Sequence, residues 1–202
     1  IDVELNYMSF AIASAGGHEV ILCRTGYTGE LGVEIIPTWE DARAVWDELS
    51  SAITRFDGRV AGLGARDTLR TEMCYPLHGH ELSLSISPVE AGATWAIGWK
   101  KDSFWGSEVL RSQKASGDHR RLVSFVMRDR GIPRAEMKVV DSSGADIGIV
   151  TSGTFSPTLK NGIGLALVAK PLNVGDEIGI DIRGKVSSAE VKPAPLVESH
   201  VR

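Results

Sequence analysis

The sequence predicts an α+β fold, in which a layer of antiparallel strands and helices is followed by a small closed or sandwich-like β domain. In the first hundred residues or so, β-prone runs alternate with segments of helical periodicity, as expected for antiparallel strands with helices on one face. After residue 120, short β-prone runs follow one another with turn residues between them, which is typical of a small barrel or sandwich. A stretch of small, polar and charged residues separates the two patterns and predicts a domain boundary.

The first predicted strands form a hairpin followed by a third strand. The β-prone runs 7–13 and 18–23 flank the turn sequence SAGG, which is a strong hairpin signal. In the run 31–36 (LGVEII) the odd-numbered positions are all apolar, while Glu34 falls on the opposite face. Because side chains alternate across a strand, we expect Glu34 to point away from the apolar face.

Two helices are predicted next. Apolar residues recur at helical spacing over 39–54, and Thr38 with Asp41 three residues later resembles a capping box at its start. A short strand at 59–61 is expected to lead into a second helix over 62–74, which opens on two glycines. These helices are expected to cover one face of the three strands.

The second half of the chain contains an irregular segment, a linker and the β domain. Residues 76–106 are rich in Gly, Ser, Pro and Trp, so we expect few regular elements there. Six β-prone runs are predicted to form the β domain, at 121–127, 137–141, 146–151, 162–168, 176–182 and 187–192. We assign domains to residues 1–105 and 121–202, with 106–120 as a linker that contains a short helix at 107–114.

Composition and charge narrow the classes of function. The 202 residues are 43% hydrophobic and carry a formal net charge of −4, so the basic surface needed for nucleic acids or anionic membranes is not expected. No apolar run approaches the roughly 20 residues that span a bilayer. Cys23 and Cys74 lie in no metal-ligand spacing, which favours a reducing compartment: the cytoplasm of a bacterium, or the mitochondrial matrix of a eukaryote. The sequence begins at Ile1 rather than Met, as expected of a processed or truncated product.

The stretch RTGYTGELGVEI, residues 24–35, has the features of a ligand-binding loop. Its glycines allow close approach of a ligand to the backbone, and Tyr27 lies between two of them. Gly32, two residues before Glu34, has no side chain to block access. The Glu34 carboxylate can accept hydrogen bonds from two adjacent donors, such as the N3–H and 2-amino group of a pterin. From spacing alone, a glutamate at such a position is more often a solvent-facing strand residue than a ligand-binding one.

A second candidate binding residue is Arg66. It falls in the first turn of the predicted 62–74 helix, where its guanidinium and the free backbone N–H groups could together bind an anion or a carbonyl. The alternative is an ordinary surface ion pair of Arg66 or Arg70 with Asp67 or Glu72, worth only ~0–1 kcal/mol. The residue types do not decide between these readings.

No metal or catalytic constellation is predicted. His78 and His80 in the sequence HGHE have Glu81 beside them but no further ligand at a suitable spacing, so we expect no metal site. The serines and histidines form no arrangement typical of a Ser-His-Asp triad, and the chain contains neither GxGxxG nor a P-loop sequence.

Taken together, these stretches resemble the aminomethyltransferase (T-protein) family of the glycine cleavage system. The motifs, in the family's order, are RTGYTGELGVEI (24–35), AGLGARDTLR (61–70), YPLHGHEL (75–82), SPVEAG (87–92) and IGIVTSGTFSPTLKNGIGLALV (147–168). The resemblance implies part of a folate-binding α+β domain with antiparallel strands over 1–105, and a β-barrel domain over 121–202.

The resemblance also implies an activity, its partners and its site residues. Proteins of this family take the aminomethyl group from the lipoyl arm of the H-protein and pass its one-carbon unit to tetrahydrofolate, releasing ammonia. The family's folate contacts match Glu34, Arg66 and Tyr27, and Tyr7 is a further candidate for an aromatic wall. The family's catalytic aspartate belongs to a segment upstream of Ile1. We therefore assign no catalytic residue to this chain and expect it to be inactive alone.

Relatives on the same scaffold leave alternatives open. These are a tetrahydrofolate-dependent demethylase, the folate domain of a dehydrogenase, and a non-catalytic folate-binding protein. The last is marked by a KGCYxGQE-type motif, in whose place this chain has RTGYTGE. The family's C-terminal segment often supplies a folate contact, but the sequence PLVESHVR at 195–202 diverges, so no contact is assigned there.

Overall fold

The computed structural model describes residues 4–201, which form two compact units. The described residues up to Leu69, together with those from Glu198 onward, make the first unit, and Arg70–Val197 make the second. The division falls within helix α2 (Leu63–Glu72). The 106–120 segment lies inside the second unit, and its role as a domain boundary stays a prediction.

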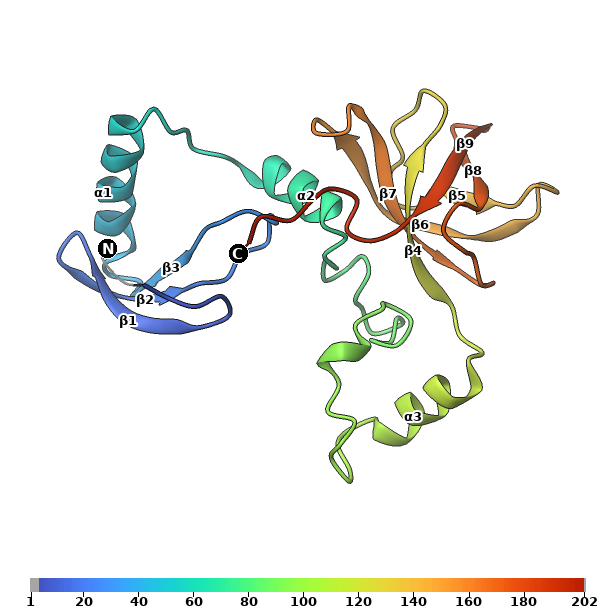
Figure 1. Ribbon diagram of the computed structural model, residues 1–202, viewed down its shortest axis with the longest axis horizontal. Coiled ribbons are helices and arrows are strands. Elements are labelled where there is room, and N and C mark those ends of the chain that lie inside the picture. Colours follow the sequence, from blue (N-terminus) through green and yellow to red (C-terminus); the bar gives the residue numbers. More distant parts are fainter. Residues whose placement is uncertain (1–3, 202) are drawn as a thin grey trace. The chain divides into compact units, whose positions relative to one another are not determined.

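The first unit contains a three-stranded antiparallel sheet with a helix on one face (Figure 1). Strands β1 (Phe10–Ala15), β2 (His18–Cys23) and β3 (Glu34–Pro37) lie in that order, and α1 is Ala42–Arg55. The hairpin turns on two glycines with positive φ, as the SAGG sequence predicts. The apolar core between the sheet and the helix consists of Ala13, Ala15, Val20, Ile35, Val45 and Leu49.

Several predicted boundaries in this unit shift. β1 begins at Phe10 rather than residue 7, and β3 begins at Glu34 rather than residue 31. Thr38 Oγ1 accepts from the Asp41 backbone N–H at 3.2 Å, but the predicted N-cap is wrong, because the N-cap of α1 is Asp41 and not Thr38.

The predicted strand at 59–61 is wrong. Residues 58–62 are exposed and take no regular structure. The side chain of Val60 is 61% exposed. Without a partner strand or a core to cover it, local β propensity does not produce a strand there.

The second unit is dominated by a closed antiparallel barrel with the strand order β4-β7-β6-β5-β8-β9. The strands are β4 (Arg121–Met127), β5 (Lys138–Val140), β6 (Asp146–Ser156), β7 (Asn161–Val168), β8 (Glu177–Ile182) and β9 (Lys185–Lys192). The core includes Phe125, Val139, Val150, Ala166 and Ile180, all at most 1% exposed. The predicted β domain is thus confirmed as a barrel.

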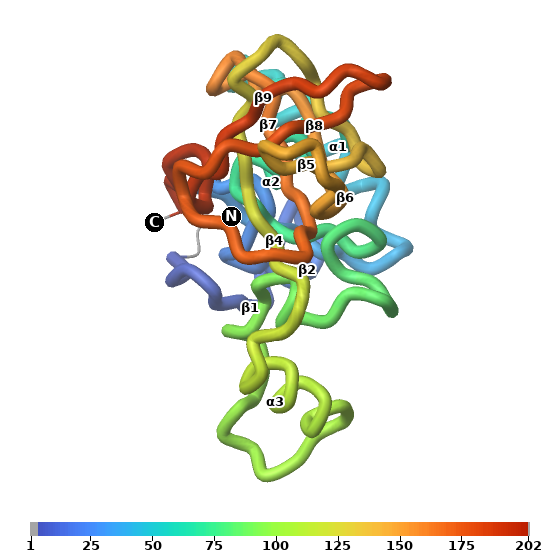
Figure 2. Tube along the Cα trace, turned by 90° about the vertical axis from the view of Figure 1, so that its right-hand side faces the viewer, coloured from blue at the N-terminus to red at the C-terminus, as the bar shows by residue number. Residues whose placement is uncertain are grey.

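The segment between α2 and the barrel is mostly irregular, as predicted. It contains a short 3₁₀ helix, η1 (Thr94–Ala96), and α3 (Ser107–Ser116). The chain passes from α3 directly into β4 (Figure 2). No helix within residues 4–201 has the length and apolar character needed to cross a membrane.

Candidate functional site

Glu34 lies at the end of the glycine-rich loop of the first unit. It is the first residue of β3, its Cα pairs with that of Cys23 at the end of β2, and its side chain is exposed. The hydroxyl of Thr25, just after β2, donates a hydrogen bond to the Glu34 carboxylate. A carboxylate has about four lone-pair positions, so this bond leaves acceptor capacity for a ligand. Glu34 faces away from α1, as predicted, because its neighbour Ile35 packs into the core.

Tyr27 and Arg66 form a stacked pair. The Arg66 Cζ atom lies 4.6 Å from the centroid of the Tyr27 ring, within the range of a cation–π contact. Arg66 is in the first turn of α2, where its backbone N–H donates to the Gly62 carbonyl at 3.2 Å. The structure therefore brings two of the predicted residues together. The guanidinium stays exposed and accessible to a ligand.

Tyr7 lies beside Arg24, the first residue of the loop motif. The Arg24 Cζ atom is 6.0 Å from the Tyr7 ring centroid. The Arg24 guanidinium also donates hydrogen bonds to the carbonyl oxygens of Gly32, at 2.9 Å, and Val201, at 2.8 Å. Sequence reasoning gave Arg24 no role, although the residue belongs to the quoted motif.

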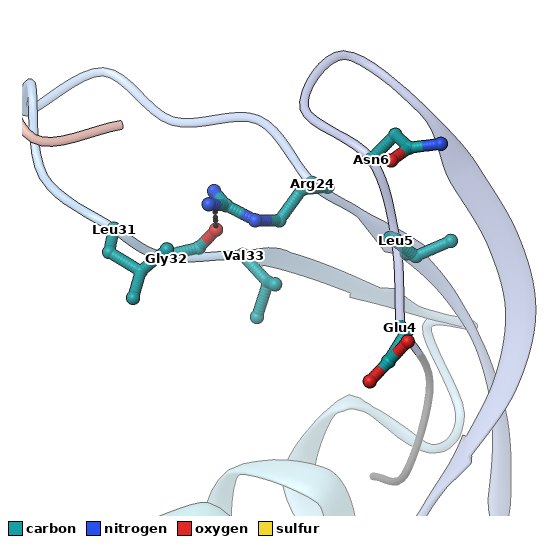
Figure 3. A pocket seen from close by; sticks show the side chains of 7 residues that line it. All are labelled: Glu4, Leu5, Asn6, Arg24, Leu31, Gly32 and Val33. Carbon is teal, nitrogen blue, oxygen red and sulfur yellow. Dashed lines mark hydrogen bonds between the residues drawn. The ribbon is translucent and has the colours of Figure 1, made fainter. Parts of the chain in front are cut away.

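An open cavity of about 680 Å³ adjoins this arginine. Its described walls are Glu4, Leu5, Asn6, Arg24, Leu31, Gly32 and Val33 (Figure 3). In Figure 3 the Arg24 side chain extends across to the Gly32 carbonyl. The volume is typical of a small-molecule site. The four predicted folate residues lie outside this lining and form local pairs around the loop, so their common role stays a prediction.

The segment 198–201 contacts the same loop. The backbone N–H of His200 donates to the Gly29 carbonyl at 2.7 Å, and the Ser199 hydroxyl reaches the same oxygen at 3.4 Å. The His200 Nδ1 lies 3.3 Å from the Glu30 carboxylate. The sequence did not predict these contacts with the loop, because the strongest of them uses backbone atoms, which leave no signature in the residue types.

Arg70 does not form the surface ion pair that the sequence analysis gave as its alternative role. Its side chain is 1% exposed and forms a salt bridge with Glu81 at 3.0 Å, within the second unit. It also donates to the Ser152 hydroxyl at 2.8 Å, and that hydroxyl donates to Glu81 at 2.6 Å. Arg70 is therefore part of a buried network that joins α2 to β6, and an exposed ion pair does not describe it.

Two residues of the HGHE sequence, His80 and Glu81, contact this network, whereas His78 and Gly79 are exposed. Glu81 is occupied by Arg70, and His80 Nδ1 lies 2.8 Å from the Thr151 carbonyl oxygen. A carbonyl can only accept, so this ring nitrogen carries the proton. Among residues 4–201, no three potential metal-ligand residues are grouped to hold an ion.

Comparison with known proteins identifies the family. The family model described as GCVT N-terminal domain matches residues 2–101, and that described as glycine cleavage T-protein C-terminal barrel domain matches residues 120–198. The chain belongs to the glycine cleavage T-protein family.

Similar proteins of the T-protein family carry the name aminomethyltransferase. One from Parafrankia sp. (strain EAN1pec) is 55% identical over 97% of this chain and 54% of its own length. One from Mycobacterium tuberculosis (strain ATCC 25618 / H37Rv) is 48% identical over 100% of this chain and 55% of its own. The crystal structure of glycine cleavage system aminomethyltransferase T from Bartonella henselae has a TM-score of 0.87 at 30% identity, over 98% of this chain and 54% of that chain. The chain thus spans about half the length of the relatives it matches.

Proposed function

We propose that this chain serves the aminomethyltransferase reaction of glycine cleavage. In that reaction the carbon–sulfur bond of the aminomethyl group on the lipoyl arm breaks. The carbon becomes the methylene of methylenetetrahydrofolate, ammonia leaves, and the arm remains as dihydrolipoyl H-protein. Membership of the T-protein family supports this reaction class. The observation that carries the proposal is the exposed Glu34 carboxylate at the end of the glycine-rich loop.

Each predicted residue has a role in this proposal. Glu34 accepts hydrogen bonds from the N3–H and 2-amino group of the pterin, while the Thr25 hydroxyl orients the carboxylate. Tyr27, with the Arg66 guanidinium stacked on it, offers one surface that is both aromatic and cationic. That surface suits the ring system or the carboxylates of folate. Tyr7 contributes an aromatic wall next to Arg24.

The proposed partners are tetrahydrofolate and the lipoylated H-protein, and no metal takes part. The proposed compartment is the cytoplasm of a bacterium, or the mitochondrial matrix in a eukaryote. The described cysteines, Cys23 and Cys74, form no disulfide, which is compatible with a reducing compartment.

We expect the 202-residue chain alone to have negligible transfer activity. None of its carboxylates is assigned to the proton transfer that the folate nitrogen requires. In addition, the Glu34 and Tyr27–Arg66 groups lie on an open surface of the unit, where water competes for the hydrogen bonds of a ligand.

The test is an ammonia-release assay with lipoylated H-protein carrying the aminomethyl group. It compares this chain with a protein extended to the relatives' full length. We expect release from the extended protein only when both tetrahydrofolate and H-protein are present, and almost none from the chain alone. Tetrahydrofolate-dependent demethylation of another substrate, without a response to H-protein, would overturn the proposal.

A further inference from the structure

Arg24 has a fixed backbone and a long reach. Its N–H donates to the Ser9 carbonyl at 2.9 Å, and its own carbonyl accepts from the Met8 N–H at 3.0 Å. These bonds continue the β1–β2 pairing past Cys23 at the end of β2. The guanidinium therefore projects from the rigid edge of the sheet.

From that base the guanidinium donates hydrogen bonds to two segments that are remote from each other in the sequence. One nitrogen donates to Gly32 O at 2.9 Å, and the other donates to Val201 O at 2.8 Å. The planar guanidinium presents its donors in a rigid fork, so it can serve two carbonyls at once. A lysine ammonium at the same position has neither the reach nor the fork.

The segment 198–201 bonds the loop at a second point. The His200 N–H and the Ser199 hydroxyl both reach the Gly29 carbonyl, and Gly29 is buried with a φ of +80°. The loop between β2 and β3 is thus held at Gly29 and at Gly32. Tyr27 lies two residues before the first point, and Glu34 lies two residues after the second.

We propose that Arg24 is a positioning residue that, with the backbone of residues 198–201, holds the 24–33 loop in the conformation that presents Tyr27 and Glu34 to the ligand. This inference rests on the proposed function for its ligand. We call Arg24 and the backbone of residues 198–201 the clamp, and its existence rests on the hydrogen bonds to Gly29, Gly32 and Val201. Because the 198–201 segment acts mainly through backbone atoms, its presence matters more than its side chains.

The test uses four variants of this chain and one control. The variants are Arg24→Ala, Arg24→Lys, a deletion of residues 198–202, and a triple alanine substitution at 199–201 that keeps the backbone. The control is Arg43→Ala, an 85% exposed arginine of α1 whose salt bridge with Asp47 lies within that helix. Amide hydrogen exchange of peptides covering 24–33 reports the clamp without any ligand.

We expect faster exchange in Arg24→Ala and in the deletion, an intermediate rate in Arg24→Lys, and parent rates in the triple alanine variant and the control. Combining Arg24→Ala with the deletion should speed exchange further, because Arg24→Ala leaves the His200–Gly29 bond and the deletion leaves the Arg24–Gly32 bond. Unchanged exchange in both Arg24→Ala and the deletion would overturn the proposal, and so would a triple alanine variant that behaves like the deletion.

Titration calorimetry with tetrahydrofolate then measures the consequence. If the binding-competent fraction of the loop falls to about one tenth, the apparent affinity falls about tenfold, and the triple alanine variant should keep the parent affinity. Should this chain give no measurable heat, the same variants are compared in a protein of the relatives' full length. Faster exchange with unchanged affinity would overturn the positioning role. Absence of binding even in the extended parent would instead refute the proposed function, and the exchange rates would then decide the clamp alone.

Discussion

At the residue scale, the role of Glu34 can be tested by changing its carboxylate. In a protein of the relatives' full length, Glu34→Ala should weaken tetrahydrofolate binding by ~1.5–3 kcal/mol, the range for hydrogen bonds to a charged group. Glu34→Gln should restore only part of this loss, because an amide offers one acceptor oxygen where the pterin presents two donors. Titration calorimetry measures both variants, with Glu40→Ala, an exposed residue outside the loop, as the matched control. Unchanged affinity in Glu34→Ala would remove Glu34 from the site.

The ion pair of Glu90 with Arg120 should make a pH-dependent contribution to the stability of the second unit. Burial acts to raise the pKa of this carboxyl, but hydrogen bonds from Arg120 and from the Ser87 N–H outweigh it and hold the pKa below its usual value. A lowered folded-state pKa means that the pairing stabilises the fold above the unfolded-state pKa, about 4.3 for Glu. That stability is lost as the pH falls through the folded-state pKa.

The expected result is that Glu90→Gln lowers the free energy of unfolding at pH 7 by about 1 kcal/mol, since Arg120 is partly exposed. The difference from the parent should shrink steadily as the pH is lowered below about 4.3. Urea unfolding at a series of pH values checks this, with Glu108→Gln, an exposed position of α3, as the control. A difference independent of pH would show that the ion pair is not its source.

The sequence could predict some of these residue positions and not others. The structure confirms that Glu34 lies on the outward face, opposite Ile35. The rest of the predicted alternation is wrong, because Leu31 and Val33 precede the strand and are 70% and 47% exposed. Arg24 could not be assigned from its neighbours, because one of its acceptors is a backbone carbonyl 177 residues away. The burial of Arg70 was likewise missed, since Ser152 lies 82 residues later and Glu81 belongs to a segment without regular periodicity.

At the element scale, two glycines with opposite surroundings provide a paired test. A Cβ at Gly148 in β6 would lie 2.3 Å from the Leu167 carbonyl oxygen of β7, whereas nothing lies within 4 Å of a Cβ at Gly64 in α2. Gly148→Ala should therefore destabilise the barrel by ~1–3 kcal/mol. Gly64→Ala should be neutral or stabilising by up to about 1 kcal/mol, because alanine favours helix. Urea unfolding measures both, and equal stabilities would contradict the close strand packing at Gly148.

The elements themselves differ in how well sequence could predict them. The six barrel strands were predicted because each β-prone run is bounded by turn residues, and each strand finds partners on both sides. β6 still extends beyond its predicted end at residue 151, because its pairing with β7 continues to Ser156. The absent strand at 59–61 and the late start of β3 reflect the reverse case, in which β-prone residues find no partner.

At the scale of the whole molecule, the uncovered face of the first sheet should cause self-association. Opposite α1, the outward positions of β1, β2 and β3 carry Phe10, Ile12, Ile21 and Ile36, which are 71%, 69%, 43% and 52% exposed. Contiguous exposed apolar residues of this kind promote association. Sedimentation velocity should show concentration-dependent association that Phe10→Ser with Ile12→Thr reduces. Trp105→Ser, a 101% exposed position in the second unit, should leave it unchanged. A monomer at all concentrations would contradict this expectation.

Limited proteolysis can locate the most accessible connection of the chain. Residues 58–62 are exposed and lack regular structure, whereas in the 106–120 segment Arg120 is bonded to Glu90 and to the Ser85 carbonyl. We therefore expect trypsin to cut first at Arg59. Mass spectrometry of early fragments checks this. A first cut at Arg120 or Arg121 would instead favour the domain boundary predicted from the sequence.

The discontinuous first unit has a consequence for how the protein is made. Gly29 and the Ser199 hydroxyl that bonds it are 170 residues apart, and at about 5–20 residues per second this separates their synthesis by roughly 10–35 s. During that interval the 24–33 loop has no partner from residues 198–201. Strand β9 (Lys185–Lys192), which closes the barrel, is made only shortly before those residues. The barrel therefore closes, and the loop gains these contacts, only after residues 185–201 have been made.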